Sequence, residues 1–350
     1  MMINLLKDVL LASHSVFKIG GPAKYFCEVN NKEELIEVVG WAKAKKLPIF
    51  VLGGGSNILV ADEGFPGLVI KNSIGGITEK GGALITVGAG EDWDKFVEFA
   101  VSRNLAGIEC LSGIPGTVGA APVQNIGAYG QSAAETIESL EALDLETDKE
   151  LFFGKSDCEF GYRTSKFKKN LGRYVITSVS FALYPGGMPK LAYHELQNYF
   201  TENHSPTLLE VRDAVLKIRS AKGMVAKGEE LHSSVGSFFT NPIISQEALE
   251  DLKLFVDQCK TAKNCCADPW FWARSDGKAK ISAACLIECA GFEKGLKRGG
   301  VGISSLHSLA IINYGGASAK EVLALADDIK NKVKDKFGVS LEIEPQLVGF

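Results

Sequence analysis

The chain has 350 residues, of which 46% are hydrophobic and 23% charged, and its formal net charge is -4. Single hydrophobic cores rarely grow beyond about 250–300 residues, so we expect more than one domain, and the composition excludes a mainly disordered chain. Dispersed Lys and Arg argue against nucleic acid as a partner, and no stretch reaches the ~20 apolar residues needed to cross a membrane.

The N-terminus and the cysteines bear on the cellular compartment. Charges at Lys7 and Asp8 come too early for a signal peptide, so we expect the protein to stay in the cytoplasm. The 8 cysteines are irregularly spaced, form no C-x-x-C pair and lack a nearby His that would complete a zinc pattern. We therefore expect free, mostly buried thiols and no metal site.

Helix and strand signals alternate in the N-terminal half. A capping residue, Asn31, precedes apolar residues at helical spacing up to position 42. The apolar run 48–52, opened by a proline, predicts a strand. After a further strand at 85–87, the spacing predicts a helix that begins near Glu91.

Later segments continue this mixed pattern. Beyond a Gly- and Pro-rich stretch, segments near 138–145 and 174–183 alternate in the manner of strands. Breaks at 185–187 and 201–206 predict a domain boundary, with one domain over 14–185 and another over 206–350. The pattern is typical of an α+β protein.

Three helices are predicted in the C-terminal part. The first is built on Leu208, Val211 and further apolar residues at helical spacing. The second spans 280–290 and is closed by Gly291, and the third is opened by a capping box from Ser318 to Glu321.

Two Gly-rich loops, 52–57 and 113–119, the second followed by the Gly-containing segment 124–130, are the main candidates for a cofactor site. Without side chains, their backbone N–H groups can approach an anion closely, so the pair suits a diphosphate held from both sides. Singly, each loop is as well explained as an ordinary connection between strands. The residues expected to hold a cofactor are Gly53, Gly54, Gly55, Ser56, Asn57, Gly113, Pro115, Gly116, Thr117, Gly119, Gly127, Tyr129 and Gly130.

Missing motifs narrow the choice of chemistry. Neither loop matches G-x-G-x-x-G, and no G-x-x-x-x-G-K-[ST] occurs, which disfavours a Rossmann site and a P-loop kinase. The sequence also contains no G-x-S-x-G or H-E-x-x-H, so the commonest hydrolase classes are disfavoured.

Read with two further motifs, the loops resemble those of one enzyme family. The motifs are Phe160-Gly161-Tyr162-Arg163-Thr164-Ser165 and Gly236-Ser237-Phe238-Phe239-Thr240-Asn241-Pro242. The chain from about His14 to Gly349 resembles the UDP-N-acetylenolpyruvoylglucosamine reductases of bacterial cell-wall synthesis, usually called MurB, with the motifs in the family's order.

The resemblance implies a fold and a reaction. The fold is an FAD-binding domain of the vanillyl-alcohol oxidase type, made of two α+β subdomains, over 14–185, followed by a smaller α+β substrate-binding domain over 206–350. In the reaction, NADPH reduces FAD, and the reduced flavin reduces the double bond of UDP-N-acetylglucosamine enolpyruvate to give UDP-N-acetylmuramate. We expect a monomer.

By the same resemblance, three residues are catalytic. Arg163 and Glu344 lie at the substrate carboxylate, where a guanidinium and a protonated carboxyl group can stabilise an enolate. Ser237 donates a proton to the enolate carbon, which is basic enough to accept one. From the residues alone, Ser237 would have a structural role, and Arg163 would be an ion-pair or surface residue. Glu344 would face solvent on an alternating strand, and Glu342, two residues away on the same face, could be mistaken for it.

Three more residues resemble substrate-binding positions. Lys222 and Asn241 match positions that hold the diphosphate and the sugar, and Tyr193 matches the tyrosine that closes over the nucleotide in the family's longer class. Their alternatives are a solvated lysine, a turn asparagine before Pro242 and a packing aromatic.

The chain also departs from the family. Val16 stands where a threonine is common, the run 344–348 differs from the usual one, and the sequence gives no function for segment 259–273. Two rival classes remain. An oxidase or dehydrogenase of the same flavin fold often attaches FAD through His or Cys, which both loops lack; a non-catalytic binding protein would not need Arg163, Ser237 and Glu344 together.

Overall fold

The computed structural model describes residues 4–200, 205–224, 233–263 and 269–350. The chain forms two compact units, and it passes between them several times. The N-terminal unit comprises Met1–Leu10, Pro22–Gly55 and Phe65–Gly228, and the C-terminal unit comprises Leu11–Gly21, Ser56–Gly64 and Glu229–Phe350. The predicted division into a cofactor-binding domain over 14–185 and a substrate-binding domain over 206–350 stays a prediction. Most of the predicted break at 201–206 lies outside the described residues.

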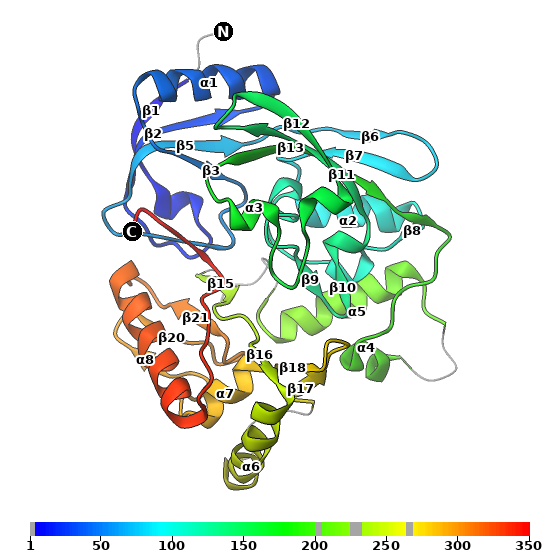
Figure 1. Cartoon of the computed structure of the whole chain (residues 1–350), viewed down its shortest axis with the longest axis vertical. Coiled ribbons are helices and arrows are strands. Elements are labelled where there is room, and N and C mark those ends of the chain that lie inside the picture. The colour runs from blue at the N-terminus through cyan, green and yellow to red at the C-terminus, as the bar shows by residue number, and fades with distance from the viewer. Residues whose placement is uncertain (1–3, 201–204, 225–232, 264–268) are drawn as a thin grey trace. The chain divides into compact units, whose positions relative to one another are not determined.

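The first sheet of the N-terminal unit has the strand order β1-β2-β5-β3, with β5 parallel to both β2 and β3 and β1 antiparallel to β2. Helix α1 covers one face of this sheet (Figure 1), where Leu35 and Val38 are fully buried. The predicted cap is confirmed, since the Asn31 side chain accepts a hydrogen bond from the Glu34 N–H at 2.8 Å. The elements are β1 (Leu6–Leu10), β2 (Pro22–Val29), α1 (Lys32–Ala44), β3 (Ile49–Leu52) and β5 (Phe65–Asn72).

The second sheet of this unit is antiparallel, with the order β12-β11-β13-β7-β6. Helix α2 packs on it through buried aromatic residues: the rings of Phe96 and Phe181 lie 4.8 Å apart, and Trp93 lies 5.9 Å from Phe181. Burying each such ring contributes roughly 1.5–3 kcal/mol. The elements are β6 (Ile77–Glu79), β7 (Leu84–Gly88), α2 (Trp93–Ser102), β11 (Ile137–Asp144), β12 (Lys149–Gly154) and β13 (Tyr174–Ala182).

Helices α4 and α5 complete the N-terminal unit around a small apolar cluster that includes Cys110, Tyr129, Leu196 and Val211. The capping box of α5 joins Thr207 to Glu210. The remaining elements are β8 (Leu105–Ala106), η2 (Glu109–Leu111), η3 (Val118–Ala120), β9 (Gly127–Ala128), β10 (Gln131–Ser132), η4 (Ala133–Glu135), η5 (Lys155–Cys158), α3 (Lys166–Lys169), β14 (Tyr184–Pro185), α4 (His194–Tyr199) and α5 (Leu208–Ala221).

The C-terminal unit contains an antiparallel sheet, β15-β21-β20-β19, with α7 and α8 packed against it. Figure 1 shows α8 beside β20 and β21. The predicted capping box of α8 is confirmed, and the helix ends at Gly338 with a positive φ of 68°. The elements are η1 (Leu11–His14), β15 (Ser234–Ser237), α7 (Ala283–Cys289), β19 (Lys297–Arg298), β20 (Val301–Ile303), β21 (Ala310–Asn313) and α8 (Ala319–Phe337).

Two smaller ladders complete this unit. One has the order β16-β18-β17, and the other pairs β4 with β22 in parallel, so the end of the chain lies beside residues 58–60. Helix α6 buries Leu249, Leu252 and Val256 in the core. The elements are β4 (Ile58–Val60), β16 (Ile243–Ser245), α6 (Gln246–Lys263), β17 (Phe271–Ala273), β18 (Lys278–Ile281) and β22 (Gln346–Val348).

The predicted α+β class is confirmed, and one expectation about the cysteines is wrong. Five cysteines, among them Cys27 and Cys110, are free and buried, but Cys285 is disulfide-bonded. Sequence spacing failed here because it does not reveal which thiols meet in the folded chain. Cys265 and Cys266 lie outside the described residues.

Within the described residues, every helix is too short or too polar to span a membrane. In these parts of the chain, no three His, Cys, Asp or Glu side chains gather in a way that could hold a metal ion.

An ion pair at the end of β11 predicts a pH dependence of stability. Hydrogen bonds from Arg173 at 2.9 and 3.1 Å, together with the Glu146 N–H, lower the pKa of Asp144 from 3.8 to about 2. Because the folded pKa lies below the unfolded one, this stabilisation is present above about pH 4 and lost as the pH falls towards 2. We expect urea unfolding of wild type and Asp144→Asn to differ by about 1–2 kcal/mol at pH 6, and much less near pH 2. A difference that stays constant over this range would contradict the prediction.

Candidate active site

The two predicted Gly-rich loops lie against each other in the N-terminal unit. A Cβ atom on Gly53 would stand 2.8 Å from the Thr117 Oγ1, and one on Gly54 would stand 2.7 Å from the Cα of Gly116. Gly116 also has a φ of 129°, which other residues rarely adopt. The structure therefore brings the loops together with backbone facing backbone.

This contact fits a dinucleotide. Bare peptide groups from two sides form the kind of surface that binds a diphosphate, and no side chain can be added at Gly54 without moving backbone. The first loop enters the C-terminal unit after Gly55, where the Asn57 carbonyl accepts a hydrogen bond from the Gln346 N–H at 3.0 Å. In the second loop, Pro115 is half-buried, and a Cβ atom on Gly119 would stand 2.5 Å from that of Ala89.

A charged residue that sequence reasoning missed supports the first loop. The Lys71 ammonium group on β5 donates a hydrogen bond to the Gly53 carbonyl. Burial lowers the pKa of Lys71 despite the nearby Glu28 carboxylate. The sequence does show a lysine within an otherwise apolar strand. It does not show that the ammonium group of this lysine contacts the Gly53 carbonyl.

Replacing Gly54 with Ala tests the loop contact. The new methyl group would push against Gly116 backbone, so we expect the free energy of unfolding to fall by about 1–3 kcal/mol and FAD affinity to fall with it. The control is Gly40→Ala on α1, where a Cβ atom meets nothing within 4 Å and where Ala should stabilise the helix by roughly 0.5–1 kcal/mol. Equal effects of the two changes in thermal denaturation and flavin titration would contradict the prediction.

Arg163 occupies a constrained turn in the N-terminal unit. Its φ is 51°, in the left-handed region, and the Thr164 N–H of the same turn donates to the Gly161 carbonyl at 3.4 Å. Its guanidinium donates to the Gly127 carbonyl at 2.9 Å, so the turn is joined to the predicted cofactor segment 124–130. Backbone strain of this kind concentrates at functional sites.

Tyr129 lies at the centre of the predicted substrate residues of this unit. The buried Tyr129 ring meets Tyr193 edge to face, with 5.5 Å between ring centroids, and the Lys222 ammonium lies 5.9 Å from the Tyr129 centroid. Lys222 also pairs with Glu195 on α4 at 2.6 Å. A Cβ atom on Gly130 would stand 3.3 Å from Ala192, beside Tyr193. The structure thus brings predicted cofactor and substrate residues together.

Sequence reasoning also missed Arg219 on α5. Its side chain is buried, donates to the Met224 carbonyl at 2.8 Å and leaves Nε without a hydrogen-bond partner among the described residues. Burial lowers the pKa of Arg219, although Tyr129 and Asp94 favour its charged form. The available signal was periodicity, because Arg212 and Arg219 are 7 residues apart on the buried face of α5.

The backbone segments that carry Ser237 and Glu344 pair with each other in the C-terminal unit. The Glu344 N–H donates to the carbonyl of Phe238, the residue after Ser237, at 2.9 Å, and Phe239 pairs with Ile343. Arg163, the third predicted catalytic residue, belongs to the other unit.

The expectation that Glu342 and Glu344 share one face is wrong. Glu344 is buried and Glu342 is exposed, because an isolated bridge, rather than a regular alternating strand, pairs this segment with its neighbour. Asn241 has a structural contact, since its side-chain oxygen accepts a hydrogen bond from the Ala283 N–H at the start of α7 at 2.9 Å.

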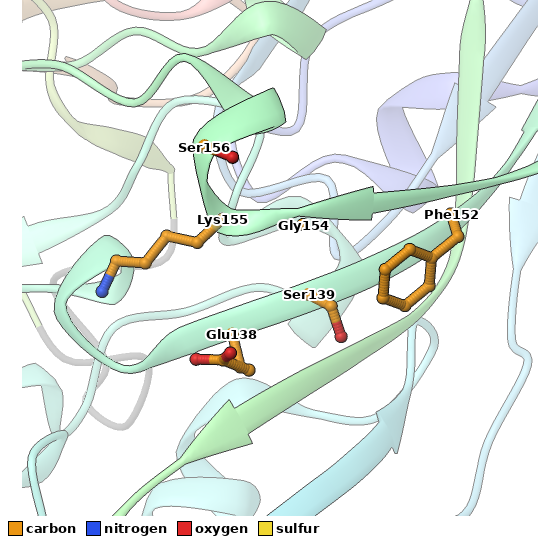
Figure 2. Close-up of a pocket in the computed structure, with 6 residues that line it drawn as sticks. All are labelled: Glu138, Ser139, Phe152, Gly154, Lys155 and Ser156. Atoms are coloured by element: carbon orange, nitrogen blue, oxygen red, sulfur yellow. The ribbon is translucent and has the colours of Figure 1, made fainter.

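A separate hollow of about 600 Å³ lies on the second sheet of the N-terminal unit. Figure 2 shows its lining residues on and around β11 and β12, including Phe152, whose side chain is exposed. Its six lining residues are Glu138, Ser139, Phe152, Gly154, Lys155 and Ser156. None of the predicted site residues is among them.

Comparison with known proteins places the chain in a family. Residues 23–149 match an FAD binding domain, and residues 228–348 match the C-terminal domain of UDP-N-acetylenolpyruvoylglucosamine reductase. The chain is 40% identical to the UDP-N-acetylenolpyruvoylglucosamine reductase of Thermobifida fusca, over 100% of this chain and 99% of that protein. It is 38% identical to that of Cutibacterium acnes, over 98% and 90% of the two chains.

A solved structure agrees with these relatives. The crystal structure of UDP-N-acetylenolpyruvylglucosamine reductase (MurB) from Thermus caldophilus is similar with a TM-score of 0.67 and 26% identity, covering 99% of both chains. Sequence similarity and fold similarity thus both extend over almost the whole chain. The chain belongs to the UDP-N-acetylenolpyruvoylglucosamine reductase (MurB) family.

Proposed function

We propose that this chain is an FAD-dependent oxidoreductase that reduces the enolpyruvyl double bond of UDP-N-acetylglucosamine enolpyruvate to give UDP-N-acetylmuramate, a precursor of peptidoglycan. NADPH is the reductant, and the enzyme acts as a cytoplasmic monomer. Membership of the family over the full length of the chain carries this proposal. The backbone contact between the loops at Gly54 and Gly116 supports the binding of a dinucleotide.

The cofactor residues act by holding a dinucleotide in place. When bound, FAD carries reducing equivalents from NADPH to the terminal enolpyruvyl carbon. The loop residues Gly53 to Asn57 and Gly113 to Gly119 hold its diphosphate with backbone N–H groups. Their close packing at Gly54 and Gly116 would reduce the ordering that the loops undergo on binding.

Arg163 and Glu344 stabilise the charge that develops beside the substrate carboxylate. A guanidinium supplies a permanent positive charge and two parallel donors, and the hydrogen bond to the Gly127 carbonyl keeps it in one orientation. In the role that the resemblance implies, a protonated Glu344 would donate a hydrogen bond to the same developing charge.

Ser237 then supplies the proton that completes the reduction. Its neighbour Gly236 has a φ of 74°, and the strand register shifts between Ser234 and Ser237, so an irregularity in the ladder directly precedes Ser237. Local irregularities of this kind re-aim side chains next to active sites.

Lys222, Tyr193 and Asn241 bind the nucleotide sugar. Lys222 carries a positive charge suited to a diphosphate, and its present partner, Glu195, would have to release it. Tyr193 stands at the start of the short helix α4 and offers an aromatic face to the nucleotide. The amide nitrogen of Asn241 can donate to the sugar while its oxygen accepts the hydrogen bond from the Ala283 N–H.

Anaerobic visible spectroscopy of the purified protein tests the proposal. We expect a flavin band that bleaches with NADPH and returns when UDP-N-acetylglucosamine enolpyruvate is added. A protein that cannot be loaded with FAD would refute the function. A flavin that is bleached but reoxidised only by oxygen would favour the rival oxidase class.

A further inference from the structure

An ion pair between a half-buried carboxylate and a buried arginine contacts the second Gly-rich loop. Asp94, in the first turn of α2, accepts hydrogen bonds from both terminal nitrogens of Arg212 on α5, at 2.6 and 2.9 Å. The same carboxylate accepts a third bond from the N–H of Gly113, the first residue of the loop, at 2.6 Å. One side chain therefore connects α2, α5 and the loop.

The chemistry of this pair makes the connection rigid. Arg212 is 7% exposed. A buried guanidinium is strongly unfavourable unless a carboxylate accepts hydrogen bonds from its terminal nitrogens. Burial alone would raise the pKa of Asp94, but the bonds from Arg212 and Gly113 outweigh burial and lower it. Asp94 therefore stays charged at neutral pH.

Helix α5 also contacts the loop directly. Gly113 has a φ of 70°, and a Cβ atom there would stand 2.8 Å from Leu216 and 3.4 Å from the Nε of Arg219, both on α5. The loop is thus held between the Asp94 carboxylate and the surface of the helix. The same helix ends at Lys222, its C-cap, so the ion pair also fixes the base of a proposed substrate residue.

We propose that Asp94 and Arg212 are positioning residues for the reaction: their ion pair holds the Gly113 loop and α5 in the arrangement that binds FAD and directs Lys222 to the substrate. Neither residue touches a ligand in this proposal, which rests on the proposed function of the two loops. The pair acts by reducing the ordering that the loop must undergo when FAD binds.

Two substitutions test the proposal in the full-length protein. Asp94→Asn removes the negative charge that pairs with Arg212. Arg212→Met removes both guanidinium donors to Asp94. For each apoprotein we expect the Kd for FAD, measured by quenching of flavin fluorescence, to rise on the order of tenfold. We expect the KM for UDP-N-acetylglucosamine enolpyruvate to rise as well, because Lys222 loses its fixed base. The double variant should be no worse than either single one, since all three remove the same interaction.

The chain offers a matched control in the same unit. Asp144 and Arg173 form another paired carboxylate and guanidinium, with bonds of 3.1 and 2.9 Å and a third bond from a backbone N–H at 3.0 Å. Asp144→Asn and Arg173→Met should lower the unfolding temperature without changing the Kd for FAD. If Asp94→Asn folds and binds FAD like wild type, or if the control variants weaken FAD binding equally, the proposal is overturned.

Two measurements cover variants that fail to fold. Arg212→Lys keeps the charge but loses the paired geometry, and we expect it to fold and to give an intermediate rise in Kd. Hydrogen exchange of wild-type apoprotein should show Gly113 protected before FAD is added; a rapidly exchanging Gly113 would refute a preformed loop. Wild-type protein that binds no FAD would instead refute the proposed function, so the two failures are distinguishable.

Discussion

Replacing Ser237 with Ala is expected to lower kcat by about 10²–10⁴, the range for loss of a general acid, while FAD and substrate still bind. The expected defect lies in one half-reaction. Reduction of the flavin by NADPH does not need the serine proton and should keep its rate. Reoxidation by UDP-N-acetylglucosamine enolpyruvate should slow by the full factor, and stopped-flow absorbance of the flavin separates the two steps.

Ser234 supplies the matched control, because it lies in the same strand. Its hydroxyl accepts a hydrogen bond from the Gly236 N–H at 3.1 Å and is buried, which is the purely structural role that Ser237 would otherwise have. Ser234→Ala should lower stability by about 0.5–1.5 kcal/mol and leave the reoxidation rate nearly unchanged. If Ser237→Ala turns over within a few-fold of wild type, Ser237 is not the proton donor.

Changes at Arg163 should separate activity from stability. Loss of a single donor to a developing oxyanion typically costs 10²–10³ in kcat, and we expect at least about this loss for Arg163→Ala and Arg163→Gly alike. Stability should differ between the two variants. Because φ is 51° at this position, Gly fits the backbone without strain, and Arg163→Gly should be more stable than Arg163→Ala by about 1 kcal/mol.

Denaturant unfolding and steady-state kinetics of the same two preparations check this prediction. Arg163→Lys is the conservative control, since it keeps a positive charge but not the paired donors, and it should recover only part of kcat. Equal stabilities of the Gly and Ala variants would show that the turn is not strained. Wild-type kcat in either variant would remove Arg163 from the catalytic set.

Local signals predicted much of the fold. Capping residues such as Asn31 and Ser318 set the starts of α1 and α8 as expected, because a cap is a bond between residues three apart. Helix α6 was missed although its signal was present: Leu249, Leu252 and Val256 follow helical spacing and are buried together. A closer count of that spacing would have found it.

What the sequence could not predict is contact between distant segments. The two Gly-rich loops were recognised separately, but their contact at Gly54 and Gly116 joins segments about 60 residues apart and forms only in the folded unit. Likewise, no local sequence pattern predicts the ion pair between Asp94 and Arg212, because the two residues lie on different helices far apart in the sequence. The cofactor and substrate roles of these segments came from family resemblance and stay predictions.

The pairing of β4 with β22 has a consequence for how the protein is made. Residues 58–60 leave the ribosome long before their strand partner, 346–348, is synthesised. The early strand therefore stays without this partner while about 290 further residues are made, and the C-terminal unit cannot close before then. An early segment of the nascent chain thus depends on one of the latest segments of this sequence for its strand pairing.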